Sequence, residues 1–234
     1  MMRVLWSTGA LAFSLALVAG GGAAHEGHKP HRGAGAAASY AFPIPEPGSY
    51  SLPVIKPAGG GPVLDDSGHR HDLAELLRGR ITVLAFIYTR CGDVCPTATL
   101  EMSRLQDLVV KDAGISRRVR LVTMSFDPEH DTPQVMRDFA EQWRSPAQSA
   151  PTWLFLTASD RETLAPVLTA YNQPVDRKPD AAVGGPLHHI FRAFLIDEGA
   201  QIRNIYSFDF FDPQLVLNDV RSLLLERRRM LDGR

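Results

Sequence analysis

The stretch FIYTRCGDVCP, residues 86–96, joins two different kinds of sequence. The run that leads into it, ITVLAFIY at 81–88, is apolar, β-branched or aromatic without strict alternation, which is typical of a strand buried on both faces. At its end, Pro96 suits the first turn of a helix, and TATLEMSRLQDLVV continues with apolar residues at helical spacing. Cys91 and Cys95, the only cysteines of the chain, therefore lie where a buried strand gives way to a helix.

Two thiols at such a junction can be chemically reactive. Unpaired backbone N–H groups and the positive end of the helix dipole stabilise a thiolate there. On a helical turn, positions i and i+4 share a face about 6 Å apart, so the sulfurs of Cys91 and Cys95 can form a disulfide or point at one ion. Two thiolates are soft ligands that favour Cu(I), and an imidazole from His188 or His189 would complete a three-ligand site. A purely structural disulfide would close a very small loop and stabilise the fold little.

The rest of the chain alternates short β-rich runs with amphipathic runs that begin at helix caps. In order, we expect a hairpin at 62–71, helices at 72–78 and from 96, a strand at 119–126, a helix at 133–144, a strand at 152–158, a helix at 161–172, a hairpin of strands at 189–197 and 201–208, and a closing helix at 212–229. This order predicts an α/β fold, a thioredoxin-like domain over residues 51–234 with a mixed central sheet, flanking helices and an N-terminal hairpin extension.

Several boundaries are specific predictions. Asp72 with Glu75 has the pattern of a capping box, and Ser159 is expected to cap the helix at 161–172. Residues 112–114 should end the helix that follows the cysteines, and residues 173–187, which lack periodicity, should form a loop.

The N-terminus has the pattern of an export signal at residues 1–24, with a short basic start, an apolar run and a small-residue cleavage site. An uncleaved membrane anchor is the alternative, and the chain would contact a membrane only in that case. Either reading places the rest of the chain in an exported compartment, the bacterial periplasm. Residues 25–50 form a flexible segment rich in His, Gly, Ala and Pro; His25, His28 and His31 could hold copper, zinc or nickel loosely, but a disordered N-terminus is the simpler interpretation.

Composition limits the other classes of function. The 234 residues carry 25 basic and 26 acidic side chains, a net charge of −1, so nothing marks a nucleic-acid-binding surface. With 44% hydrophobic residues the chain can bury one sizeable core. The sequence has no Gly-rich phosphate loop and no internal repeat.

Three motifs resemble those of the Sco (SenC) family, copper proteins that assist cytochrome c oxidase assembly. FIYTRCGDVCP resembles the family signature. SFDPEHDTPQVM, residues 125–136, is similar to its S-x-D-P-x-x-D-T-P loop. HHIFRAFLIDEGAQI, residues 188–202, is similar to a third motif in which a histidine precedes an apolar strand ending in Asp and Gly. The likeness extends over roughly residues 51–230 with the motifs in order.

The resemblance implies a copper metallochaperone whose metal ligands are Cys91, Cys95 and His189, the histidine eight residues before Asp197. It implies copper as Cu(I), with Cu(II) left open, and delivery to the CuA centre of an oxidase subunit. The role of His188 stays open. Gly92 departs from the family pattern, which often has proline there and so a stiffer loop.

Three alternatives remain at this point. The same dithiol would serve a thiol–disulfide oxidoreductase acting on an oxidase subunit or another exported protein, although that chemistry needs no imidazole. A peroxidase-like enzyme would need one reactive cysteine near an arginine, and Arg90 is adjacent in sequence. The carboxylates of the 125–133 motif could act as an acid–base pair, but we expect Asp127, Glu129, His130 and Asp131 to shape the turn and cap the next helix. Asp93 is expected to stabilise a turn.

Overall fold

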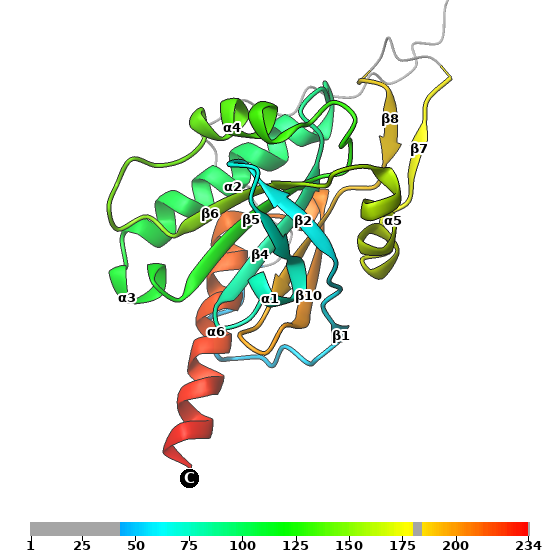
Figure 1. Cartoon of the computed structure of the whole chain (residues 1–234). Coiled ribbons are helices and arrows are strands. Elements are labelled where there is room, and N and C mark those ends of the chain that lie inside the picture. Colours follow the sequence, from blue (N-terminus) through cyan, green and yellow to red (C-terminus); the bar gives the residue numbers. More distant parts are fainter. Residues whose placement is uncertain (1–42, 180–183, 234) are drawn as a thin grey trace, which may run out of the picture. The chain divides into compact units, whose positions relative to one another are not determined.

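The computed structural model describes residues 43–179 and 184–233 (Figure 1). The predicted export signal at 1–24, His25, His28 and His31 lie outside the described residues. Within the described ranges, no helix combines the length and the apolar character needed to cross a membrane.

The centre of the fold is a mixed sheet with the strand order β1-β10-β9-β4-β5-β6-β2-β3. The central strands β4, β5 and β6 run parallel, and β9 lies antiparallel to β4. This arrangement confirms the α/β fold with a mixed sheet. The bounds are β1 (Lys56–Pro57), β2 (Pro62–Asp65), β3 (Arg70–Asp72), β4 (Ile81–Ile87), β5 (Val119–Ser125), β6 (Thr152–Thr157), β9 (Arg192–Ile196) and β10 (Gln201–Ser207).

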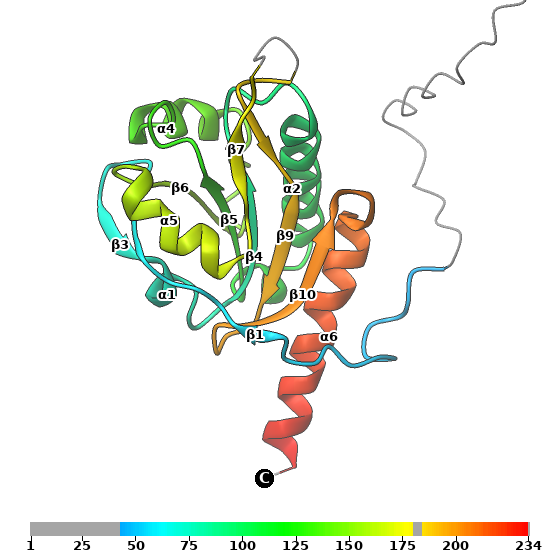
Figure 2. The ribbon, with the colours of Figure 1, turned by 90° about the vertical axis from the view of Figure 1, so that its right-hand side faces the viewer.

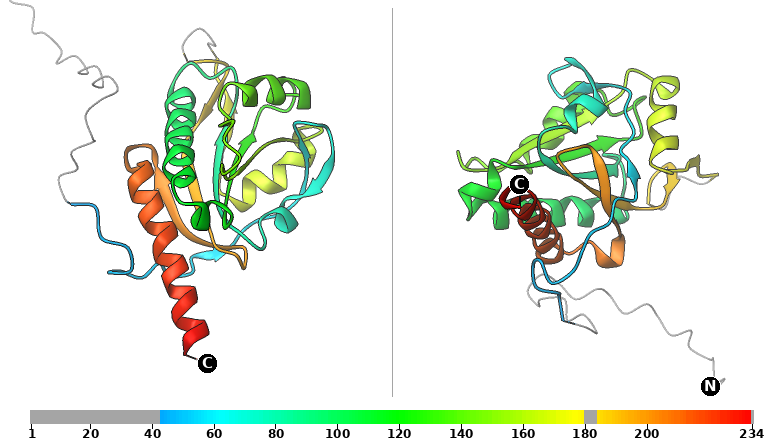
Figure 3. Two further views of the ribbon diagram at one scale, coloured as in Figure 1. Left: turned by 90° about the vertical axis from the view of Figure 1, so that its left-hand side faces the viewer. Right: turned by 90° about the horizontal axis from the view of Figure 1, so that it is seen from below.

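Helices cover both faces of this sheet. On one face, buried side chains of α2, α4 and α6 form one apolar cluster with Val83 and Ala85 of β4, and α2 lies beside α6 (Figure 3). On the other face, α1 and α5 pack against Leu84 and Phe86 (Figure 2). Every residue of β4 is buried, as its sequence, apolar except at Thr82, predicts. The bounds are α1 (Leu73–Leu76), α2 (Val94–Val110), α3 (Ala113–Ser116), α4 (Pro133–Glu141), α5 (Arg161–Ala170), the 3₁₀ helix η1 (Phe208–Phe210) and α6 (Pro213–Asp232).

The predicted N-terminal hairpin is present as β2 and β3, and it continues the sheet because β2 pairs antiparallel with β6. Gly68 has φ +85° in its turn, a conformation that glycine adopts without strain. Asp72 caps α1 as expected, accepting hydrogen bonds from the N–H groups of Ala74 and Glu75. Contacts with α6 begin before Ser51, since the carbonyl of Pro45 accepts a hydrogen bond from Asn218.

Two predicted helix boundaries are wrong by short distances. Residues 112–114 do not end the helix after the cysteines; α2 stops at Val110, and Asp112 caps the separate short helix α3 by accepting from Gly114 and Ile115. Asp160, not Ser159, caps α5, because its carboxylate accepts from the N–H of Thr163 at 2.7 Å. Both errors arise where two capping residue types stand close together.

The prediction of an unstructured loop at 173–187 is also wrong in part. Strand β7 (Val175–Arg177) pairs antiparallel with β8 (Leu187–His189) in a separate two-stranded sheet. The predicted strand at 189–197 is therefore two pieces, since His189 ends β8 and β9 begins at Arg192. We call β7 and β8 together the arm. Its pairing joins residues 10 to 14 positions apart in the sequence, so periodicity within either segment does not reveal it.

Candidate metal centre

The two cysteines lie on different backbone structures. Strand β4 ends at Ile87, and Cys91 lies in the loop that follows, with its N–H donating to the carbonyl of Tyr88 at 3.3 Å. Helix α2 begins at Val94, so Cys95 lies in its first turn. The prediction that helical i, i+4 spacing brings the thiols together is therefore wrong. The fold of the loop before α2 brings Cys91 to Cys95.

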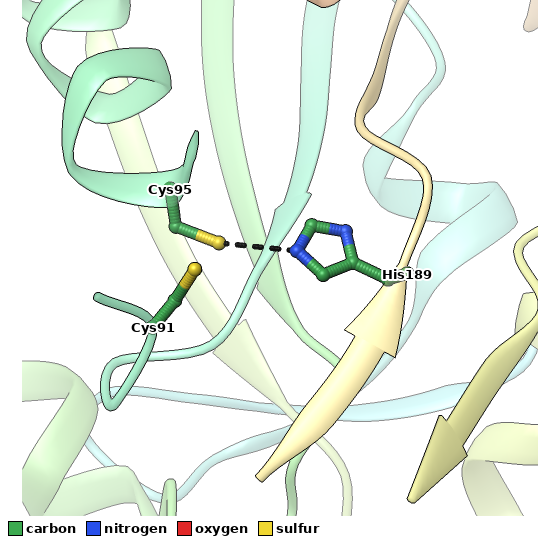
Figure 4. Close-up of side chains that lie close together, drawn as sticks. All are labelled: Cys91, Cys95 and His189. Atoms are coloured by element: carbon green, nitrogen blue, oxygen red, sulfur yellow. Dashed lines mark hydrogen bonds between the residues drawn. The ribbon is translucent and has the colours of Figure 1, made fainter. Parts of the chain in front are cut away.

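His189 reaches the cysteines from the arm. Its Nε2 lies 3.5 Å from the Sγ of Cys95, and the ligand atoms of Cys91, Cys95 and His189 all lie within 4.8 Å of one another (Figure 4). Among the described residues, this is the one group of three or more His, Cys, Asp or Glu side chains that could hold a metal ion. His188 is exposed, because successive residues of a strand point to opposite faces.

Aromatic rings hold the imidazole of His189. The ring of Phe126 lies 4.6 Å from it between centroids, and Tyr88 meets it edge-on at 5.9 Å. Its Nδ1 is buried and makes no hydrogen bond with any described residue. Packing thus fixes the ring with Nε2 directed at the sulfurs.

The pKa values of the two thiols are shifted in opposite directions. A hydrogen bond from Cys95 is the largest cause that lowers the pKa of Cys91 to about 4; His189 and the backbone N–H groups of Asp93 and Cys95 add to it, against the effect of burial. The same hydrogen bond, together with burial, raises the pKa of Cys95 well above its usual range. Cys91 is therefore the thiolate and Cys95 the thiol that donates to it. The N–H groups of Asp93 and Cys95, at the start of α2, are among the groups that lower the pKa of Cys91.

We expect Cys91 of the reduced, metal-free protein to react with iodoacetamide before Cys95. Its rate should change little between pH 6 and 8, because a group with a pKa near 4 is already ionised there. An ordinary thiol, with a pKa of about 8.5, would instead react roughly tenfold faster per pH unit over this range. Mass spectrometry of timed samples measures both rates.

The control variant is Cys95→Ala, which removes the strongest cause of the lowered pKa of Cys91. The pKa of Cys91 should rise, and its alkylation should become strongly dependent on pH. Equal, pH-dependent labelling of both cysteines in the unaltered protein would contradict the assignment of the thiolate to Cys91.

Two buried carboxylates brace the loop that carries Cys91. Asp131 accepts from the N–H of Thr89 at 3.0 Å and from its hydroxyl at 2.5 Å, and Asp127 accepts from Arg90 at 2.6 Å. The expectation that these acids cap the next helix is wrong: Thr132 caps α4, its hydroxyl accepting from the N–H of Val135. Sequence analysis missed this bracing, since the partners of Asp131 and Asp127 lie 42 and 37 residues away.

The site is open on one side. A pocket of about 280 Å³ lies beside Cys91 and His189, and Asp93, Ile190 and Phe208 contribute to its walls. Asp93 precedes α2 without making a side-chain capping bond. The pocket gives a small ligand or a partner's side chain a path to Cys91.

Comparison with known proteins connects this geometry to one family. The family model described as SCO1/SenC matches residues 63–225. The SCO1 protein homolog of Bacillus subtilis (strain 168) is 30% identical over 106 residues, which cover 45% of this chain and 52% of that protein. The chain thus spans about half the length of this curated relative.

Solved structures share the fold. The crystal structure of Arabidopsis thaliana ScoI with copper bound has a TM-score of 0.62 at 21% identity, covering 72% of this chain and 98% of that one. The structure of Bradyrhizobium japonicum ScoI with copper bound has a TM-score of 0.58 at 26% identity, covering 70% and 97%. These neighbours confirm the expected fold.

Proposed function

The chain belongs to the SCO1/SenC family, and from that premise we propose that it is a copper metallochaperone with Cys91, Cys95 and His189 as its copper ligands. The observation that carries the proposal is the convergence of two sulfurs and one imidazole nitrogen within 4.8 Å. The copper-bound ScoI of Bradyrhizobium japonicum supports copper as the metal.

The donor set fits copper. Two sulfurs and an imidazole are soft or intermediate ligands, which suit Cu(I) and bind hard cations such as Mg²⁺ or Ca²⁺ poorly. Three ligands on one side of an ion leave another side free, and the pocket beside Cys91 and His189 lies next to them. Cys91 is already a thiolate, whereas Cys95 must release its proton when the metal binds.

Copper is the cargo in this proposal, and the acceptor is the CuA centre of an oxidase subunit in the periplasm. A thiolate of the acceptor enters through the pocket and displaces one protein ligand at a time. His189 is a suitable first ligand to leave, because it is carried by the arm and not by the central sheet. Residues 1–24 would direct the chain to that compartment.

Anaerobic Cu(I) titration of the reduced protein against a competing chelator tests the proposal. We expect one tightly bound ion per chain. His189→Ala should lower the affinity by at least about tenfold, because losing even an outer partner of a metal ligand typically weakens metal binding by roughly 10–100-fold. His188→Ala, on the opposite face of β8, is the matched control and should bind as the unaltered protein does. Weak binding whose affinity is unchanged in His189→Ala would refute the copper proposal.

A thiol–disulfide oxidoreductase is the second candidate. The observation in its favour is the pairing of a Cys91 thiolate with a protonated Cys95 beside an open pocket. Mixing the reduced protein with an oxidised CuA-type domain separates the two functions. A chaperone leaves the domain's disulfide intact and transfers copper only from its loaded form to a domain that is already reduced, whereas an oxidoreductase reduces the disulfide without copper while forming a Cys91–Cys95 disulfide.

A further inference from the structure

We propose that Tyr88 is a positioning residue whose hydroxyl fastens the arm to the end of β4 and thereby holds His189 beside the two cysteines. This inference rests on the proposed copper function for its importance, but the contact itself is independent of any metal. Tyr88 directly follows β4 and is 1% exposed.

The hydroxyl of Tyr88 contacts backbone carbonyl groups of the segment that leads to His189. It donates to the carbonyl of Gly184 at 2.8 Å and lies 3.2 Å from the carbonyl of Leu187, two residues before His189. The backbone N–H of Gly92 points at the same Gly184 carbonyl from 3.4 Å. Proline, which the family pattern often places at this position, could not supply that N–H.

The close packing at Gly185 is an independent sign that this contact is built into the fold. Gly185 has φ +91°, a region that other residues rarely enter. A Cβ atom there would lie 2.5 Å from the hydroxyl oxygen of Tyr88 and 2.6 Å from the carbonyl oxygen of Arg90. The segment just before β8 therefore approaches the loop that carries Cys91 as closely as a backbone without a side chain permits.

The arm needs such an attachment. Within the described residues, β7 and β8 pair only with each other, over three residues each. A two-stranded sheet alone is marginally stable in water. The ion pair of Arg177 with Glu129 joins side chains that are 61% and 53% exposed, where such pairs contribute little. The buried attachments of β8 are thus Leu187, the ring contacts of His189 with Phe126 and Tyr88, and the hydroxyl of Tyr88.

The test compares Tyr88→Phe with Tyr171→Phe. Each substitution removes one buried hydroxyl that donates to a backbone carbonyl; for Tyr171 the acceptor is Gly59 at 3.1 Å, away from the cysteines. A loss of general stability should therefore be similar in the two variants. Only Tyr88→Phe should affect His189.

The first readout is metal-free. In proton NMR, the ring of Phe126 at 4.6 Å should displace the His189 imidazole signals, which His189→Ala identifies. Tyr88→Phe should return these signals toward the positions of a mobile histidine, and Tyr171→Phe should leave them in place. The second readout is transfer of bound Cu(I) to a chelator, which Tyr88→Phe should accelerate about fivefold to tenfold, the effect of losing one net hydrogen bond. Gly185→Ala should change both readouts in the same direction.

Unchanged His189 signals and an unchanged release rate in Tyr88→Phe would overturn the inference, as would equal changes in Tyr171→Phe. Failure of the unaltered protein to bind copper would refute the proposed function. The NMR comparison would still decide whether Tyr88 positions His189.

Discussion

Replacing Cys91 with serine is expected to lower the affinity for Cu(I) by at least about a thousandfold, equivalent to about 4 kcal/mol. The substitution exchanges a polarisable thiolate for a hydroxyl that stays protonated at neutral pH, and Cu(I) binds such an oxygen poorly. Burial still disfavours the thiolate form of the remaining Cys95, although the contact with Cys91 that most raises its pKa is lost in this variant. Cys95→Ser should cause a loss of the same order, because it also leaves one sulfur at the site.

Met102→Leu provides the control for this prediction. Met102 is a buried sulfur residue on the same helix, α2, and it is not one of the converging ligands. Leucine conserves its volume, so the free energy of unfolding should change by less than about 1.5 kcal/mol and copper binding should persist. Titration with a chelator of known affinity gives the Cu(I) dissociation constants of Cys91→Ser, Cys95→Ser and Met102→Leu. If Cys91→Ser kept its copper affinity within tenfold of the unaltered protein, the Cys91 sulfur could not be a ligand.

The sequence was sufficient to predict the mixed sheet and the strand, β4, that supports the site. The run at 81–88 is apolar at every position except Thr82, and this pattern identifies a central strand without further information. The hairpin at 62–71 and the caps Asp72 and Thr132 follow from residue types that act locally. These features are predictable because their causes lie within a few residues of each other.

The geometry of the candidate site was only partly predictable. Residue types and the family resemblance identified Cys91, Cys95 and His189, and the structure brings these three together. The reason for their proximity was not accessible, since it depends on the loop before α2 and on the register that pairs Val175 with His189. Two strands of three residues, with mostly exposed side chains in β7, leave no periodic pattern to detect.

The buried carboxylate of Asp131 illustrates the same limit and gives the second large prediction. We expect Asp131→Ala to lower the free energy of unfolding by about 3–5 kcal/mol, because it leaves several buried donors without an acceptor at about 1–3 kcal/mol each. Asp131 is fully buried and accepts from the hydroxyl of Ser125 at 2.5 Å as well as from the N–H and hydroxyl of Thr89. Urea unfolding of the reduced protein measures the change.

Two further variants make this prediction specific. Asp138→Ala removes an exposed carboxylate of α4 that accepts from the side-chain amide of Gln134, and it should change stability by less than about 0.5 kcal/mol. Asp131→Asn keeps the shape of the side chain but turns an amide N–H toward donors, so its cost should fall between those of the two alanine variants. Because Thr89 lies two residues before Cys91, Asp131→Asn should also weaken Cu(I) binding while the protein remains folded. A loss below about 1 kcal/mol in Asp131→Ala would mean that water replaces the carboxylate, and that the loop carrying Cys91 is held by Arg90 and Asp127 instead.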